Sequence, residues 1–228
     1  MVALAFEGHA KGSVEKVGVE IKDLVIAGWT GRDVAALNHH IEELKAIGVQ
    51  PPSQVPIYYR VAASMLTQAD TIQVLGDDSS GEVEAVLIGA ADRLWVTIGA
   101  DHTDRKVESY GIAVSKQMCA KPVGRTAWRF EEVEPHWDRL MLRSFVTEGG
   151  KRVSYQEGPL ANIRAPRELI AGWKGEKRLP VGVAMFLGTM GAIGGIRSAQ
   201  RFEMELEDPV LHRKLTHGYT IESLPIVS

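Results

Sequence analysis

The stretch GEVEAVLIG, residues 81–89, has the composition of a buried β-strand, because apolar and β-branched residues fill it and a glycine stands at each end. Side chains alternate between the two faces of a strand, so Glu82 and Glu84 share a face with Val86 and Ile88. That face is apolar at one end and doubly acidic at the other. Two like charges beside an apolar surface are unfavourable unless something positive compensates them. The stretch therefore predicts a buried strand with a charged site at its mouth.

The pair Glu82 and Glu84 has two interpretations. Residues two apart on a strand have Cα atoms about 7 Å apart and point the same way, which lets two carboxylates meet at one cation. The alternative is the solvated face of an antiparallel sheet, which commonly carries glutamate. The stretch RFEMELED, residues 201–208, is assigned to that alternative, because its glutamates share one face and its apolar residues fill the other.

A third carboxylate, Asp101, follows the next predicted strand in the segment IGADHTDR. A side chain at a strand end can reach the mouth of the neighbouring strand. Carboxylate oxygens are the ligands that hard cations such as Mg²⁺, Mn²⁺ and Ca²⁺ select. For Asp104, hydrogen bonding to its own turn is the simpler role. His102 has the chemistry of a metal ligand, although a lone loop histidine more often has another role.

Residues 30–47 are predicted to form a helix. Thr30 with Asp33 three residues later makes a start similar to a capping box, and apolar residues then repeat at intervals of three and four as far as Ile47. Gly48 and the two prolines beyond it favour an end at that point.

Within this helix, His40 and Glu43 are three residues apart and are therefore neighbours on its surface. A carboxylate that binds one ring nitrogen fixes the tautomer and orientation of a histidine, as a general base acting on water requires. The competing pairs are His39 with Glu42 and His39 with Glu43. An ordinary exposed charged helix is the third interpretation.

Most of the chain after residue 50 has the pattern of short strands separated by turns. The predicted strands are VPIYYRVA, TIQVLG, EVEAVLIG, RLWVTIGA, YGIAVS, TAWRF, VGVAMFLGT and RFEMELED. An earlier strand is predicted over residues 16–27, and further helices over residues 134–148 and 166–173. No repeat or linker divides the chain. The fold class is therefore mainly β with peripheral helices, and one domain is expected over residues 1–228.

Composition narrows the class of function. The chain has 228 residues, 26 basic and 29 acidic, and no basic block, so nucleic acid is not an expected partner. The apolar run 179–196 contains a proline and five glycines, which favours strand and turn over a membrane helix. Cys119, the one cysteine, is expected in the core, and the N-terminus lacks the pattern of a secretory signal. A cytoplasmic location is the default expectation.

From about residue 31 to the end, the sequence resembles the fumarylacetoacetate hydrolase superfamily. The stretch EVEAVLIG is similar to that family's E-x-E strand, which implies Glu82 and Glu84 as metal ligands. The segment ADHTDRK is similar to the family's NDxSxRD segment, which implies Asp101 as the third ligand and leaves Asp104 outside the site.

Other motifs extend the resemblance. HIEEL followed by QPPSQVPIYYR is similar to the family's lid helix and proline-rich step, which implies His40 and Glu43 as the catalytic pair. SKQMCAKPVG is similar to a segment that places a lysine near the substrate, which implies Lys116. LGTMG is similar to the family's TGTP turn, which implies that Gly188 and Thr189 contact the substrate's carbonyl or carboxylate end.

The sequence also departs from the family's pattern. Met190 stands where the turn proline is usual, Arg60 stands near a position that often carries lysine, and a short helix before Asp101 is missing. Arg60 is expected to bind the substrate, whose pocket is expected to differ from the family's. The resemblance implies a β-roll or sandwich, with a strand and lid helix in residues 1–50 and a β-rich core in residues 51–228.

The function implied is that of an Mg²⁺- or Mn²⁺-dependent enzyme, with Ca²⁺ as a crystallographic substitute, acting on a small 1,3-dicarbonyl or 2-oxo acid. The expected reaction is C–C bond hydrolysis of the acylpyruvate-hydrolase type, with a metal-stabilised enolate and water activated by His40 and Glu43. Decarboxylase, hydratase and tautomerase activities are alternatives on the same scaffold. A non-catalytic binding or assembly protein and a structural calcium site are alternatives of another class. The resemblance implies a homodimer.

Overall fold

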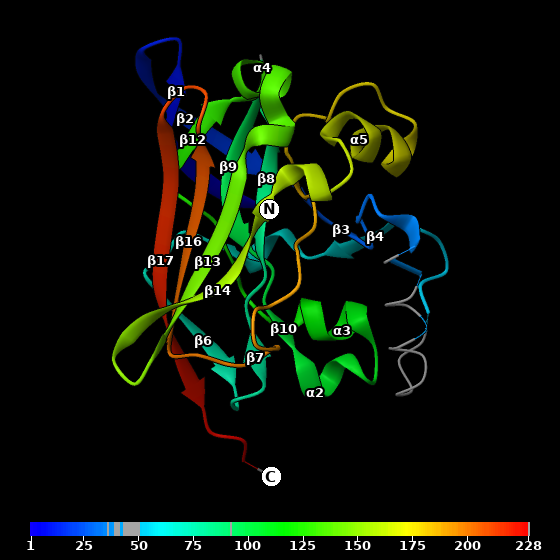
Figure 1. The fold of residues 1–228 in the computed structure, drawn as a ribbon, viewed down its shortest axis with the longest axis vertical. Coiled ribbons are helices and arrows are strands. Elements are labelled where there is room, and N and C mark those ends of the chain that lie inside the picture. The colour runs from blue at the N-terminus through cyan, green and yellow to red at the C-terminus, as the bar shows by residue number, and fades with distance from the viewer. Residues whose placement is uncertain (36, 39–41, 43–50, 92, 228) are drawn as a thin grey trace.

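The structure is a computed structural model, and it describes residues 1–35, 37–38, 42, 51–91 and 93–227. Most of the described residues in regular structure form strands, and two large sheets pack against each other (Figure 1). None of the helices in the described part of the chain has the length and apolar character that a membrane span requires.

The larger sheet places the predicted acidic strand near its centre. Within the described residues it has eight strands, in the spatial order β2 (Ser13–Ile21), β1 (Val2–Ala10), β12 (Thr126–Arg129), β9 (Leu94–Ala100), β8 (Val83–Gly89), β15 (Val183–Phe186), β3 (Asp23–Gly28) and β4 (Ile57–Val61). Strand β8 is antiparallel to both of its neighbours, β9 and β15. All seven residues of β8 are buried.

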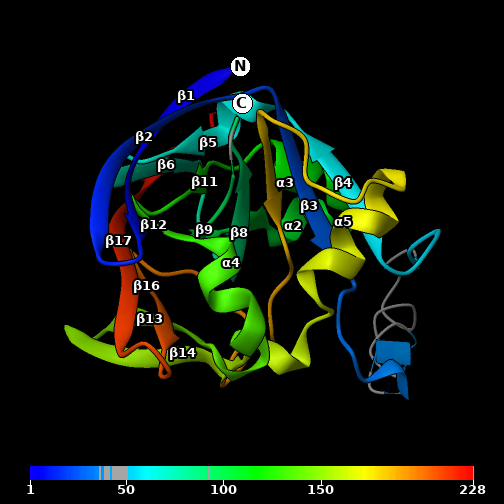
Figure 2. The ribbon, with the colours of Figure 1, turned by 90° about the horizontal axis from the view of Figure 1, so that it is seen from above.

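The second sheet packs against one face of the first. Its strands in the described residues are, in order, β14 (Lys151–Pro159), β13 (Met141–Glu148), β16 (Arg201–Asp208), β17 (Arg213–Leu224) and β6 (Thr71–Leu75). Figure 2 shows β13, β16 and β17 on one side of β8 and β9, with α5 and β4 on the other side of the molecule.

Short elements connect the sheets. Two small pairings join β7 (Ser79–Ser80) to β10 (Thr103–Asp104) and β5 (Leu66–Thr67) to β11 (Lys121–Pro122). The α-helices are α2 (Arg105–Glu108), α3 (Ile112–Gln117), α4 (Phe130–Val133) and α5 (Pro166–Lys174), and the 3₁₀ turns are η1 (Ala63–Met65), η2 (Glu134–Arg139) and η3 (Leu160–Asn162).

The two faces of β8 enter two different hydrophobic clusters. Val83 and Leu87 pack in the cluster between the two large sheets. Val86 and Ile88 pack in a second cluster, which the N-terminal strands and β15 build on the opposite face. This confirms the alternation predicted for the stretch. Glu84 consequently extends from the same face as Val86 into surroundings that are otherwise apolar.

Strand β16 confirms the contrasting interpretation of the second glutamate-rich stretch. The apolar residues that alternate with the glutamates of β16, Phe202, Met204 and Leu206, are all buried. On the other face, Glu205 and Glu207 pair with the Arg143 Nη1 atom at 3.1 and 2.5 Å. Those glutamates are held by surface ion pairs across the sheet.

Several predicted elements differ in the structure. The strand predicted over residues 16–27 is two strands, β2 and β3, separated at Lys22, and the N-terminal strand β1 was not predicted. The helix predicted over residues 134–148 is wrong beyond Arg139, because the chain turns there and continues as β13. Alternate residues of β13 are buried, so its pattern has the two-residue period of a strand.

The segment YGIAVS was predicted as a strand and forms the helix α3 instead. A short apolar run does not distinguish strand from helix by its pattern. The helix is held by ordinary local bonds, including Ser115 Oγ to the Ile112 carbonyl at 2.8 Å. It buries Ser115 and Lys116 on one face. This face brings Lys116 toward β8.

Two helix predictions have different outcomes. The helix predicted over residues 166–173 is confirmed as α5, which begins at Pro166 and stops at the left-handed Gly175. Of the helix predicted over residues 30–47, helical conformation is described at residues 34, 35, 37, 38 and 42. His40 and Glu43 lie outside the described residues.

Gly89, which ends β8, allows a close approach of two backbone segments. A Cβ atom at this position would lie 2.1 Å from the Pro180 carbonyl oxygen, and the Gly182 N–H donates to the Gly89 carbonyl at 2.9 Å. We expect Gly89→Ala to lower the free energy of unfolding by about 1–3 kcal/mol, because the backbone must shift. Urea denaturation measures this, with Gly18→Ala in β2 as the control, since no atom lies within 4 Å of that Cβ position. Equal stability of the two variants would contradict the close packing.

Candidate functional site

The three predicted carboxylates meet at the open end of β8. The Asp101 N–H donates to the Glu82 carbonyl at 2.8 Å, which sets the residue just before β8 opposite the residue just after β9. One oxygen from each of Glu82, Glu84 and Asp101 lies within 4.8 Å of the others. Glu82 is partly exposed, whereas Glu84 and Asp101 are buried. The structure therefore brings the three residues into one cluster, as predicted.

Glu84 is the most poorly compensated member of the cluster. Its side chain is buried at 2 % exposure, and its Oε2 accepts a hydrogen bond from the Gly188 N–H at 2.6 Å. Burial and the nearby Asp101 charge raise the pKa of Glu84 well above its usual value. A cation in contact with Glu84 would keep its carboxylate ionised.

Asp101 is held by two buried lysines. Burial alone would raise the pKa of Asp101, but Lys116 and Lys121 outweigh it and lower that pKa below its usual value. Lys116 Nζ donates to Oδ2, and Lys121 Nζ lies 3.3 Å from Oδ1. Lys121 also donates to the carbonyls of His102 and Cys119, so it ties the segment after β9 to the end of α3.

Lys116 is a buried cation that lies beside the carboxylates. Its Nζ lies 3.7 Å from Glu82 Oε2 and donates to Thr103 Oγ1 at 3.3 Å, in addition to its contact with Asp101. Nζ also lies 5.8 Å from the centre of the Tyr59 ring. Burial alone would lower the pKa of Lys116, but Asp101 and Glu82 raise it above its usual value. Lys116 is therefore a fixed positive charge at the site.

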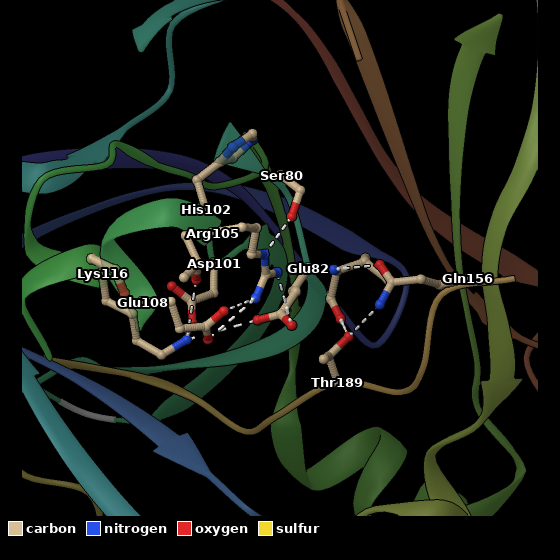
Figure 3. A network of polar contacts seen from close by, with 12 residues as sticks. Ser80, Glu82, Asp101, His102, Arg105, Glu108, Lys116, Gln156 and Thr189 are labelled. Carbon is tan, nitrogen blue, oxygen red and sulfur yellow. Dashed lines mark hydrogen bonds and ion pairs between the residues drawn. The ribbon is translucent and has the colours of Figure 1, made fainter. Parts of the chain in front are cut away.

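Arg105 supplies a second positive charge (Figure 3). Its guanidinium lies 3.1 Å from Glu82 Oε1 and 3.1 Å from Glu108 Oε2, and its Nε donates to Ser80 Oγ at 2.7 Å. The short helix α2 places it there, and Asp104 caps that helix by accepting the Lys106 N–H at 3.0 Å. The turn role predicted for Asp104 is confirmed.

His102 is not part of the carboxylate cluster. It hydrogen-bonds Ser79 Oγ through Nδ1 at 3.0 Å and Tyr219 OH through Nε2 at 2.7 Å. Burial and the charge of Lys121 lower the pKa of His102 to about 3, so the ring is neutral. His102 links Ser79 on β7 to Tyr219 on β17.

A glutamine fixes the turn after β15. Gln156 Oε1 accepts from the Val83 N–H at 2.9 Å and from Ser144 Oγ at 2.9 Å, while its Nε2 donates to Thr189 Oγ1 at 2.8 Å and to the Met190 carbonyl at 2.7 Å. Thr189 Oγ1 in turn donates to the Val83 carbonyl at 2.6 Å. The single hydroxyl proton of Thr189 is thus already committed.

A cavity of about 800 Å³ opens over the cluster. The predicted site residues that line it are Glu82, Glu84, Asp101, Lys116, Gly188 and Thr189. Arg60 is not among the described residues lining the cavity: it pairs with Asp23, and its guanidinium lies 5.9 Å from the Trp173 ring. The structure therefore does not bring Arg60 together with the other predicted site residues. Residues alternate along β4, and it is Tyr59 that faces the cavity.

Four residues of the site were not predicted. Arg105 lies within the quoted segment ADHTDRK but was not singled out, and Gln156 lies on a strand that the pattern did not indicate. Tyr59 and Trp29 line the cavity. Trp29 follows β3 with φ of 58°, a left-handed conformation that is unusual for a bulky residue. A sequence pattern carries no signal for that conformation.

The fold is similar to that of several solved structures, in agreement with the mainly β architecture that the resemblance to the fumarylacetoacetate hydrolase superfamily implied. The structure is similar to crystal structures of Cg1458, with a TM-score of 0.65 and 15 % identity over 90 % of this chain and 78 % of that chain. It is similar to 2-keto-3-deoxy-D-arabinonate dehydratase complexed with magnesium and 2,5-dioxopentanoate, with a TM-score of 0.62 and 13 % identity over 91 % of this chain and 75 % of that chain. It is also similar to 4-oxalocrotonate decarboxylase from Pseudomonas putida G7 complexed with calcium and acetate, with a TM-score of 0.55 and 14 % identity over 88 % of this chain and 76 % of that chain.

The chain belongs to the family described as "Protein of unknown function (DUF2848)", whose model matches residues 27–219. No curated protein matches the sequence. The matched range includes the carboxylate cluster, Lys116 and the turn after β15.

Gln156→Leu tests whether this side chain holds the site together. The variant leaves the buried Val83 N–H and the Ser144 and Thr189 hydroxyls short of partners, so we expect the free energy of unfolding to fall by about 2–4 kcal/mol. Gln73→Leu on β6 is the matched control, because Gln73 is exposed and makes a 3.3 Å contact with Glu222. Chemical denaturation measures both variants. A loss no larger than that of the control would show that the Gln156 network is unimportant.

Proposed function

We propose that this protein is a divalent-cation-dependent enzyme that acts on a small 2-oxo acid or 1,3-dicarbonyl compound. The observation that carries the proposal is the buried Glu84 carboxylate, which lies beside two further carboxylates and forms part of a cavity wall. Oxygen ligands of this kind suit Mg²⁺, Mn²⁺ or Ca²⁺. The similar structures complexed with magnesium and calcium support the same class of ion.

A structural ion-pair network without a metal is the competing interpretation of the cluster. Arg105 and Lys116 already contact Glu82 and Asp101, and they would neutralise two of the three carboxylates. Glu84 distinguishes the two interpretations, because in the described structure its hydrogen-bond donor is the neutral Gly188 N–H. A buried carboxylate without a contacting cation is costly unless it takes up a proton, which is the direction in which the raised pKa of Glu84 points. A divalent ion would supply the missing charge.

The residues of the chain have separate tasks in the proposed reaction. Glu82, Glu84 and Asp101 would hold the cation, which when bound acts as a Lewis acid toward the oxygens of a 2-oxo acid. Lys116 places a permanent positive charge beside the reacting oxygens, where negative charge develops as a bond next to the carbonyl breaks. The Gly188 N–H orients Glu84.

The sequence predicted that Thr189 contacts the carbonyl or carboxylate end of the substrate, but its hydrogen bonds favour a different role. Because its hydroxyl proton is donated to the Val83 carbonyl, Thr189 has no proton left for a substrate oxygen. We propose that Thr189 shapes the turn instead, and that a substrate carboxylate lies near the cation and Lys116.

We further propose that His40, oriented by Glu43, activates water, which would make C–C bond hydrolysis the reaction. Both residues lie outside the described structure, so this assignment rests on the sequence. Decarboxylation, hydration and tautomerisation would use the same carboxylates and lysine, and they are the alternatives if no water attacks the distal carbonyl of the substrate. The homodimer stays a prediction.

Glu84→Gln tests the proposed function. We expect it to abolish Mg²⁺ and Mn²⁺ binding in titration calorimetry, because the amide carries no charge, and to abolish cation-dependent turnover of acylpyruvates and oxaloacetate followed by loss of enol absorbance. Glu205→Gln is the matched control, since Glu205 belongs to the ion-paired face of β16. Glu84→Gln with unchanged cation affinity would remove the metal assignment. Cation binding by the wild-type protein without turnover of any 2-oxo acid would favour a non-catalytic protein.

A further inference from the structure

We infer that the part of the substrate distant from the cation is uncharged and apolar. The inference rests on the proposed function and specifies its substrate class. It concerns the large apolar side chains of the cavity lining, here called the apolar wall: Trp29, Leu37, Tyr59, Ile112, Met190 and Ile196.

The apolar wall begins directly beside the charged cluster. Ile112 precedes Lys116 by four residues on α3, so it lies on the same helix face, one turn or about 5.4 Å away. The Tyr59 ring lies 5.8 Å from Lys116 Nζ. Met190 directly follows Thr189 in the turn that contacts Glu84 and β8. A small acid bound to the cation that the carboxylates hold would therefore direct its remaining atoms along this wall.

The cationic side chains described around the cavity are all matched with carboxylates. Arg32 makes a bidentate pair with Asp138, at 2.7 and 2.5 Å, and its Nε donates to the Ile163 carbonyl. Arg105 pairs with Glu82 and Glu108. Lys116 belongs to the carboxylate cluster, where the proposed function uses it.

The other charged residues of the described lining are acidic. Asp33 and Glu108 line the cavity, and Glu108 pairs with Arg105. A substrate with a second carboxylate at its far end would lose hydration there, and among the described lining residues it would find no cation without a carboxylate partner, which is unfavourable. An alkyl or aryl end would instead cover apolar side chains, such as Ile196 at 57 % exposure, and remove them from water.

Two acylpyruvates of equal chain length test the inference, one ending in a branched alkyl group and the other in a carboxylate. We expect kcat/KM with Mg²⁺ to favour the alkyl compound by about tenfold or more, the usual scale for discrimination by an apolar pocket. Ile112→Arg, and independently Ile196→Arg at the more exposed edge of the wall, should narrow or reverse that preference. Val114→Arg is the matched control, because Val114 lies on α3, is 46 % exposed and is absent from the described cavity lining.

The outcomes separate the inference from the proposed function. Equal turnover of the two compounds by the wild type, or faster turnover of the dicarboxylate, would overturn the apolar-end inference and leave the proposed function standing. A preference that the two wall variants leave unchanged, although both remain folded by circular dichroism, would also overturn it. Failure of the wild type to turn over either compound or to bind either one with Mg²⁺ in calorimetry would overturn both proposals.

Discussion

Glu84 brings a carboxylate into a part of the sheet where the surrounding strand residues are apolar and buried, and much of the local structure compensates for that burial. Its neighbours on the same face, Val86 and Ile88, belong to a hydrophobic cluster. The Gly188 N–H meets one of its oxygens. That contact depends on a left-handed turn, with φ of 102° at Gly188, where a Cβ atom would lie 1.9 Å from Thr30 Oγ1. Glycine is therefore required at this turn.

The second sheet holds the same turn from the other side. Gln156 extends from β14 and joins the backbone of β8 to Thr189 and Met190 through its amide. The carboxylate cluster is thus positioned by two sheets at once, and the cavity lies where they meet the turn. This arrangement leaves Lys116 and the apolar wall on the open side.

The sequence was sufficient to predict the features that depend on local periodicity and composition. The two-residue alternation of β8 predicted the shared face of Glu82 and Glu84, and the strand end after β9 predicted the reach of Asp101. The same argument separated this stretch from β16, where glutamates face arginines across the sheet. The short apolar run around Ile112 carried no such period, and it forms a helix.

Features that depend on contacts between distant segments were not predicted. Arg60 carries the charge expected for a substrate contact, but its partner Asp23 lies on the neighbouring strand β3, and only the strand pairing reveals this. The hydrogen bond from the Thr189 hydroxyl to the Val83 carbonyl forms because the turn after β15 lies beside β8. Gln156 belongs to no sequence motif that would have singled it out. Hydrogen-bond geometry across 33 residues of chain, as between Gln156 and Thr189, leaves no periodic signal in a single sequence.

The most direct test of the central claim is anomalous diffraction from crystals of the protein grown with Mn²⁺. We expect an anomalous peak between Glu82, Glu84 and Asp101, with carboxylate oxygens at about 2.0–2.6 Å from the ion. Well-ordered carboxylates that contact Lys116 and Arg105 alone, with no peak between them at saturating Mn²⁺, would contradict it.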